Sequence, residues 1–218
     1  MSGRGVQMYE LKDGVWVNSS TNIPLSLVAI NNEYGSDYII QEAVEQSDYI
    51  SQFNKTSVNT LRLSLYRSVV DNQCHVTGAI MRIGGKGSVV DNAHAGGVFV
   101  GINQDGTFFF FFYNQYGQKY TKFNDIDFAD DYRYPNWNNV LSFAKSVAQY
   151  VPHHRLIALD IVLDKDDNPH LIEFNIEAYS SWLFQYTTGS AFGKFTDEII
   201  EYSLKHQPRK VFKLIMNH

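Results

Sequence analysis

Two acidic residues and an amide near the C-terminal end of the chain have types and spacing that suit chemistry. Asp160 lies in one strand-like run, residues 156–163, and Glu173 and Asn175 lie in a second run, residues 170–175. In a symmetric hairpin that pairs the facing ends of these runs, Asp160 lies directly opposite Glu173. Asn175 shares their face because strand side chains alternate. The spacing therefore predicts two carboxylates and an amide within reach of one another.

Carboxylates that face each other across a strand pair repel, unless a proton or a cation lies between them. A hard divalent cation resolves the repulsion. Proteins hold Mg²⁺ with one or two carboxylates, while water and substrate phosphates fill its other positions. The hairpin therefore predicts a platform for a metal–nucleotide complex. The same residues also fit a solvated hairpin face with scattered acids, and both alternatives are open at this point.

The elements that position these side chains are strands of a mainly antiparallel sheet, mixed with helices. In residues 59–70, leucines alternate with polar residues, which predicts a strand with one dry and one wet face. Further strands are predicted over residues 6–11, 15–17, 38–44, 75–82, 96–102 and 107–113. Helices are predicted over residues 24–35, 48–53, 135–148 and 195–205. Because strands and helices do not alternate strictly, the fold class is α+β rather than a doubly wound parallel sheet.

Composition and charge exclude several classes of protein. The 218 residues can form a sizeable core without disulfides or metal, and the net charge of -5 gives no reason to approach nucleic acid or an anionic membrane. No apolar run approaches the roughly 18 residues of a membrane helix, so we expect no membrane insertion. The single Cys74 and the absence of a signal-like N-terminus favour the cytoplasm.

At this point the residues resemble a known superfamily. Asp160 followed by Glu173-Phe174-Asn175 is similar to the metal-binding signature of ATP-grasp proteins. Other segments resemble the sugar-transfer-associated branch of that superfamily, in the expected order: residues 57–62, 82–85, 91–97 and 135–137. The resemblance covers nearly the whole chain. It implies the central and C-terminal portion of an ATP-grasp fold, with a mainly antiparallel sheet flanked by helices.

The resemblance implies roles for individual residues. Asp160, Glu173 and Asn175 would be the Mg²⁺ ligands. Gln41, Glu42 and Val44 would belong to a hinge strand that reads the adenine of ATP.

Three further residues receive roles near the phosphates from the same resemblance. Arg62 would reach the γ-phosphate from the polar face of its strand. Arg82 and Asn92 would serve the phosphate or acceptor side. Without the resemblance, Arg62 also fits a surface strand arginine and Asn92 a turn residue.

The first residues of the chain resemble the end of the family's glycine-rich loop, with Gly3 and Gly5 over the nucleotide phosphates. Residues 1–43 would be a remnant of the N-terminal ATP-grasp subdomain, and residues 44–218 the C-terminal subdomain. The phosphate-gripping lysines of the family lie upstream of that loop. We therefore expect a fragment of a longer protein, a chain completed by another chain, or a protein without catalysis.

The activity that the resemblance implies is ATP-dependent ligation. The γ-phosphoryl group of Mg²⁺-ATP would pass to a small-molecule carboxylate, and an amine or similar nucleophile would attack the acylphosphate. The family association suggests biosynthesis of surface polysaccharide or sugar conjugates.

Two alternatives stay open: a non-catalytic nucleotide-binding module, and a carbohydrate-binding α+β protein that uses its aromatic residues. Residues 108–112, five consecutive phenylalanines, rather suit a strand buried on both sides. The acceptor and the oligomeric state are not predicted.

Overall fold

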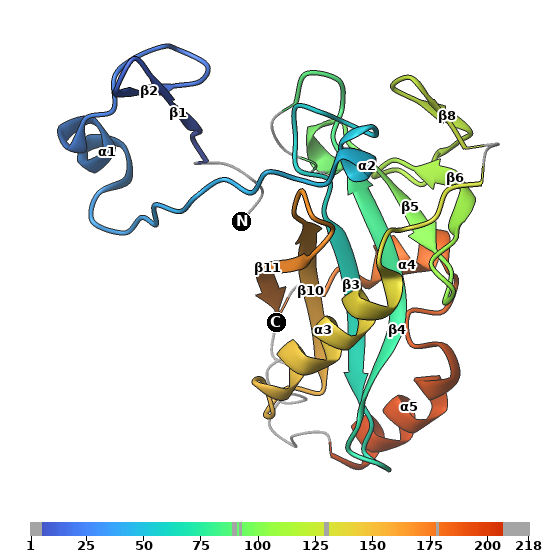
Figure 1. Cartoon of the computed structure of the whole chain (residues 1–218). Helices are drawn as coiled ribbons and strands as arrows, with labels where there is room; N and C mark the ends of the chain where they lie inside the picture. The colour runs from blue at the N-terminus through green and yellow to red at the C-terminus, as the bar shows by residue number, and fades with distance from the viewer. Residues whose placement is uncertain (1–5, 89–90, 92, 129–130, 178, 207–218) are drawn as a thin grey trace, which may run out of the picture. The chain divides into compact units, whose positions relative to one another are not determined.

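The chain forms two compact units, residues 1–45 and residues 46–218 (Figure 1). The structure is a computed structural model that describes residues 6–88, 91, 93–128, 131–177 and 179–206.

Unit 1, residues 1–45, contains a β-hairpin and one helix. Strands β1 (Tyr9–Lys12) and β2 (Val15–Asn18) pair antiparallel around Asp13 and Gly14, which both have positive φ angles. The turn thus uses the backbone freedom that an Asp-Gly dipeptide provides. Helix α1 (Leu27–Tyr34) begins at the capping residue Ser26 and ends at Gly35. The strands predicted over residues 6–11 and 15–17 and the helix predicted over residues 24–35 are confirmed.

The strand predicted over residues 38–44 is wrong. Residues 37–45 have no regular secondary structure, and the side chains of Ile39 and Ile40 are 88% and 69% exposed. A run of β-favouring residues becomes a strand only when a neighbouring strand pairs with its backbone groups. No strand within the described part of the chain pairs with this segment.

Unit 2, residues 46–218, is built on a seven-stranded sheet in which every neighbouring pair is antiparallel (Figure 1). In spatial order its strands are β11 (Pro169–Asn175), β10 (Leu156–Leu163), β3 (Leu61–Arg67), β4 (Cys74–Ile83), β5 (Val98–Ile102), β6 (Phe108–Tyr113) and β7 (Lys119–Tyr120). A separate two-stranded pair is formed by β8 (Lys122–Phe123) and β9 (Ile126–Asp127). The α+β class and the antiparallel sheet are confirmed.

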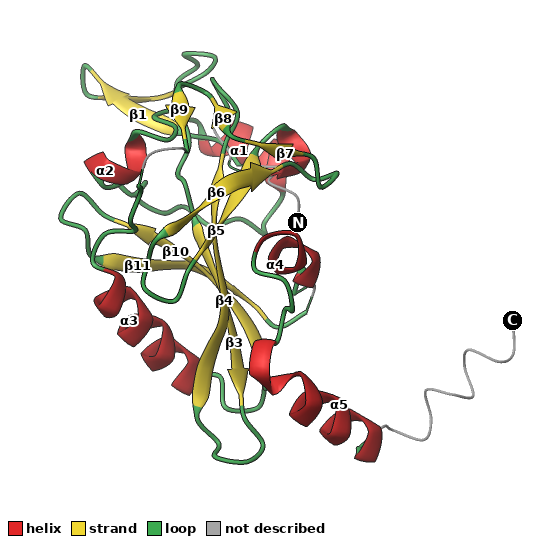
Figure 2. Cartoon of the chain, turned by 90° about the vertical axis from the view of Figure 1, so that its right-hand side faces the viewer, coloured by secondary structure: helices red, strands yellow, loops and turns green. Residues whose placement is uncertain are grey.

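Helices cover both faces of this sheet. Figure 2 shows α3 (Trp137–Gln149) on one side and α4 (Ser181–Thr187) and α5 (Thr196–Lys205) on the other. The larger apolar cluster joins α3 to alternate residues of β3 and β10, and a smaller one joins α4 to β4 and β5. The short α2 (Asp48–Ser51) adds Ile50 to the larger cluster. Short 3-10 turns lie at Ala93–Ala95 and Gly193–Phe195.

Strand β3 differs from the prediction of one dry and one wet face. Leu61, Leu63 and Leu65 pack in the larger apolar cluster, as expected. The opposite face carries Arg62 and Ser64, and these side chains are buried as well. The alternation identifies the polar face correctly, but β3 lies at the centre of a sheet that is covered on both sides. Its polar face is therefore a buried polar layer.

Strand β11 is the edge strand, and a bulge shifts its register. Asp160 pairs with Glu173, but Ile161 pairs with Leu171, so Ile172 is the additional residue. Position 163 consequently faces position 169 rather than position 170. Ile172 and Phe174 carry large apolar side chains, yet they are 42% and 48% exposed. An edge strand has a neighbour on one side only, which leaves these side chains less covered.

The phenylalanine run is only partly buried. Phe108 and Phe112 lie in the larger apolar cluster, whereas Phe110 is 60% exposed. A strand buried on both sides is therefore the wrong description of residues 108–112. Among the described strands, β6 lies one strand from the sheet edge, and its outer neighbour there is the two-residue β7.

Candidate functional site

Asp160 lies in the middle of β10, between two strands that place charged side chains beside it. Its Cα partners are Arg62 on β3 and Glu173 on β11, so the three side chains share one face of the sheet. Asp160 is fully buried, whereas the Glu173 side chain is 56% exposed. The predicted pairing of Asp160 with Glu173 is confirmed. One carboxylate is thus enclosed, and the other reaches solvent beside it.

Two arginines neutralise the Asp160 carboxylate. Arg62 donates from Nε to Oδ1 at 2.6 Å and from Nη2 to Oδ2 at 2.7 Å, in the bidentate geometry that a planar guanidinium favours. Arg82 on β4 adds a hydrogen bond from Nη2 to Oδ2 at 2.9 Å. We call Asp160, Arg62 and Arg82 the Asp160 cluster.

Burial alone raises the pKa of Asp160, but the hydrogen bonds and charges of Arg62 and Arg82 outweigh burial and bring this pKa below its ordinary value. Burial alone lowers the pKa of Arg62, and the hydrogen bonds to Asp160 more than compensate, so the pKa of Arg62 is raised. Both groups are therefore ionised at neutral pH.

This arrangement corrects the argument that the repulsion calls for a divalent metal cation. Arg62 Nη2 lies 3.7 Å from Glu173 Oε1 while Arg62 also holds Asp160, so a guanidinium already offsets the repulsion between the carboxylates. A metal ion is not needed to make the strand pairing stable. A cation that enters this site has to share Asp160 with two arginines.

The residues predicted to hold Mg²⁺ supply the hard oxygen donors that this ion takes. Besides the two carboxylates, Asn175 contributes an amide oxygen, because its Nδ2 is the atom that donates to Glu173 Oε1 at 3.3 Å. Among the described residues, no group of three or more His, Cys, Asp and Glu side chains could hold a metal ion. The site therefore needs Asn175 as its third donor. The donor chemistry fits Mg²⁺, and Asp160, with its side chain 1% exposed, is the least accessible donor.

Arg82 is held on its other side by Thr60 and Asp91. Arg82 Nε and Nη2 donate to Thr60 Oγ1 at 2.8 and 2.6 Å, and Nε lies 3.6 Å from Asp91 Oδ2. Asp91 accepts hydrogen bonds from both the backbone N–H and the hydroxyl of Thr60. Arg82 therefore lies between two carboxylates, those of Asp160 and Asp91.

Sequence reasoning gave no role to Thr60 or Asp91. Thr60 carries a usable signal, since it lies two positions before Arg62 and period two places it on the same face. Asp91 carries none, because it meets Thr60 across 31 positions of sequence through a contact that no local pattern indicates.

The other six predicted site residues lie in unit 1 or outside the described residues. Gln41 and Glu42 are exposed and Val44 is half-buried, all in unit 1 within the irregular residues 37–45. The hinge strand that was expected to present them is absent from those residues. Gly3, Gly5 and Asn92 lie outside the described residues. The roles of these six residues stay predictions.

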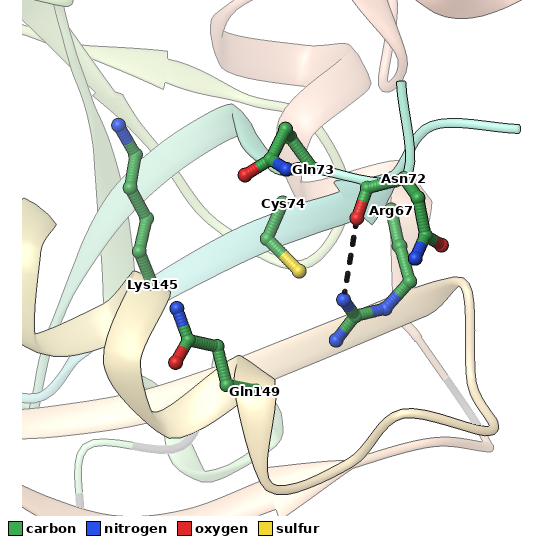
Figure 3. A pocket seen from close by; sticks show the side chains of 6 residues that line it. All are labelled: Arg67, Asn72, Gln73, Cys74, Lys145 and Gln149. Atoms are coloured by element: carbon green, nitrogen blue, oxygen red, sulfur yellow. Dashed lines mark hydrogen bonds between the residues drawn. The ribbon is translucent and has the colours of Figure 1, made fainter. Parts of the chain in front are cut away.

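A cavity of about 300 Å³ opens at the other end of β3 (Figure 3). It is lined by Arg67, Asn72, Gln73, Cys74, Lys145 and Gln149. Arg67 donates to the carbonyl of Ala148 near the end of α3, at 2.7 Å. Arg67 therefore has a structural role here, because it satisfies a carbonyl at the C-terminal end of the helix. Burial raises the pKa of the Cys74 thiol, so this cysteine is a poor nucleophile. Arg67 and Arg62 lie at opposite ends and on opposite faces of β3, so the cavity is separate from the Asp160 cluster.

The antiparallel sheet and its Asp–Glu–Asn hairpin are the features expected of an ATP-grasp protein. The family model for sugar-transfer associated ATP-grasp matches residues 11–199, and the chain belongs to this family. Membership indicates an ATP-binding, ligase-like function. No curated protein matches the chain. Among the helices of the described residues, none has the length and apolar character needed to cross a membrane.

Proposed function

We propose that the protein binds Mg²⁺-ATP beside the Asp160 cluster and transfers the γ-phosphoryl group to a small-molecule carboxylate. A carboxylate oxygen forms a bond to the γ-phosphorus while the bond from that phosphorus to the bridging oxygen breaks, which leaves ADP and an acylphosphate. An amine or similar nucleophile then attacks the acyl carbon, and inorganic phosphate departs. Membership of the ATP-grasp family supports this reaction class.

One observation carries the proposal: a buried Asp160 adjoins an exposed Glu173 on one face of the sheet, with two arginines paired to Asp160. Asp160, Glu173 and Asn175 would hold the metal ion. When bound, Mg²⁺ neutralises phosphate charge.

Arg62 and Arg82 have the chemistry to stabilise phosphate oxygens. A guanidinium presents several N–H donors in a fixed plane, and its charge offsets the charge that develops during transfer. Once a cation shares Asp160, the attraction that holds the arginines to this carboxylate weakens. We expect the N–H groups that this frees to donate to the phosphates.

The family's association with sugar transfer favours a role in the biosynthesis of surface polysaccharide or sugar conjugates. We place the reaction in the cytoplasm, where ATP is available and a lone cysteine stays reduced. The net charge of -5 gives no support for a nucleic-acid substrate.

A second candidate is nucleotide binding without phosphoryl transfer. It is favoured by the Asp160 carboxylate, whose two oxygens are both engaged by arginines while its side chain is only 1% exposed. A carboxylate that keeps these partners contributes to the fold but gives little to a metal ion. The two candidates differ in turnover, so a single-turnover assay that follows release of ADP separates them.

Isothermal titration with Mg²⁺-ATP tests the binding site that both candidates share. We expect binding that requires the metal, and we expect Glu173→Gln to weaken it by at least about 10-fold, because even the outer partners of metal ligands are worth about 10–100-fold. Glu173 is largely exposed, so this variant keeps the fold. Glu201→Gln on α5, where the side chain is 71% exposed, is the matched control. Equal affinity in the parent and Glu173→Gln would place the metal elsewhere.

A further inference from the structure

We infer that Asp91, acting through Thr60, is a positioning residue that keeps the Arg82 guanidinium beside Asp160, where it meets a phosphate oxygen of the nucleotide. The inference rests on the proposed function, because it assigns Arg82 to the nucleotide phosphates.

The direction of the hydrogen bonds means that Asp91 determines how Thr60 accepts the N–H groups of Arg82. A threonine hydroxyl has one proton and two lone pairs. Thr60 donates its proton to Asp91 Oδ2, so its lone pairs are left to accept the two N–H groups of Arg82. Removing the Asp91 carboxylate frees the hydroxyl to rotate, and the acceptor geometry for Arg82 is lost.

Thr60 is itself fixed from both sides. Its backbone N–H donates to Asp91 Oδ2 at 2.8 Å, and its carbonyl accepts from the backbone N–H of Arg82 at 2.8 Å. Thr60 and Asp91 are 6% and 9% exposed. Water therefore competes little for the hydrogen bonds between Thr60 and Asp91, and the Arg82 side chain next to them is 16% exposed.

The two arginines differ in what holds them. Within the described residues, the ion pairs of Arg62 go to Asp160 and Glu173, which are both predicted metal ligands. Arg82 has an anchor outside that ligand set, formed by Thr60 and Asp91. When a cation draws on Asp160, Arg82 therefore keeps its place. This independence makes Arg82 the arginine that is pre-positioned for phosphate.

We call the hydrogen bonds from Asp91 through Thr60 to Arg82 the relay, and a double-mutant cycle tests it. We expect Asp91→Ala, which removes the acceptor of the Thr60 hydroxyl, to raise the Kd for Mg²⁺-ATP about tenfold in the parent, but less than about twofold in an Arg82→Gln background, because coupled residues are not additive. Thr60→Ser keeps the hydroxyl and should keep the affinity, whereas Thr60→Val should behave like Asp91→Ala. Asp125→Asn, at a side chain 87% exposed, is the matched control.

Three outcomes overturn the relay: equal effects of Asp91→Ala in both backgrounds, a loss of affinity in Thr60→Ser as large as in Thr60→Val, or a lower Tm of Asp91→Ala with an unchanged Kd. The last result means that Asp91 serves only stability. If the parent shows no Mg²⁺-dependent binding of ATP, the proposed function fails instead. The relay is then decided by the same cycle on the Tm of the ligand-free protein, where additive shifts for Asp91 and Arg82 overturn it and coupled shifts support it.

Discussion

At the scale of residues, Asp160 is the central charged group of the site, because both arginines pair with it. Its carboxylate is enclosed between Arg62 and Arg82, and three hydrogen bonds join the three side chains. Removing one member of such a buried ion pair leaves the other charges uncompensated in a medium where they are poorly solvated. The fold therefore depends on Asp160 even before any ligand binds.

We expect Asp160→Asn to lower the free energy of unfolding by about 3–5 kcal/mol, the usual cost of breaking a buried ion pair. Urea denaturation followed by circular dichroism measures the loss. Asp125→Asn at the surface should change it by less than about 0.5 kcal/mol. A loss at Asp160 as small as that of the control would mean that the arginines are solvated without it.

The same carboxylate predicts a pH dependence. The pKa of Asp160 is lower in the folded state than in the unfolded chain, so its stabilisation is complete above the unfolded value of about 3.9 and is lost as the pH falls through the folded value. The difference in unfolding free energy between the parent and Asp160→Asn should stay constant down to about pH 5 and then narrow. The difference is the quantity to follow, because a hydrogen bond with His170 lowers the pKa of Asp164 to about 2 and affects both proteins alike. A gap that widens in acid contradicts the assignment.

At the scale of elements, α4 approaches β4 closely because Gly78 has no side chain there. A Cβ at this position would lie 2.7 Å from Cδ1 of Phe184, a fully buried ring of the smaller apolar cluster. The close contact of Gly78 with Phe184 therefore lets α4 cover the face of β3 and β4 that carries the polar layer.

Gly78→Ala should therefore destabilise the protein by about 1–3 kcal/mol through overpacking. Phe184→Leu removes the ring that the new methyl group meets, so the double variant should lose less than the sum of the two single losses. Thermal denaturation of the four proteins checks this. Strict additivity would show that Gly78 and Phe184 do not determine the distance between α4 and β4.

Most of the elements near the site were predictable from sequence, because long periodic runs carry a strong signal. Strand β10 has the predicted bounds, and the pairing of Asp160 with Glu173 follows from hairpin symmetry. The pairing is correct although the assumed register at the turn is wrong, since the bulge in β11 compensates. Helix α4 and strands β7 to β9 were missed, because two to seven residues are too short for a period to appear.

The sequence did not predict which elements cover each face of the sheet either. The alternation in β3 separates leucines from polar residues, but it does not say that helices cover the polar side. The ion pairs of Asp160 were missed for the same reason. They depend on the order β10-β3-β4 in the sheet, which brings Arg62 and Arg82 to a residue 98 and 78 positions away.

At the scale of the whole molecule, the buried apolar residues are distributed unequally. Ile30 is the one buried apolar side chain among the described residues of unit 1, whereas both apolar clusters belong to unit 2. Because stability varies within a protein with local burial, the two units should open with different free energies.

Hydrogen exchange measured by mass spectrometry on the full chain checks this difference. Amides of β3 and β10 should exchange slowest, at a rate set by global unfolding. Amides of β1, β2 and α1 should exchange at least about a hundredfold faster, because few buried contacts oppose their opening. Equal protection in the two units would show that they unfold together.

The most direct test of the central claim is a crystal structure with Mg²⁺ and a non-hydrolysable ATP analogue. We predict a metal ion about 2.0–2.1 Å from oxygens of Asp160, Glu173 and Asn175, the distance typical of Mg²⁺, with a guanidinium of Arg62 or Arg82 on a phosphate oxygen. A nucleotide bound elsewhere, with Asp160 still held only by its two arginines, would contradict the account.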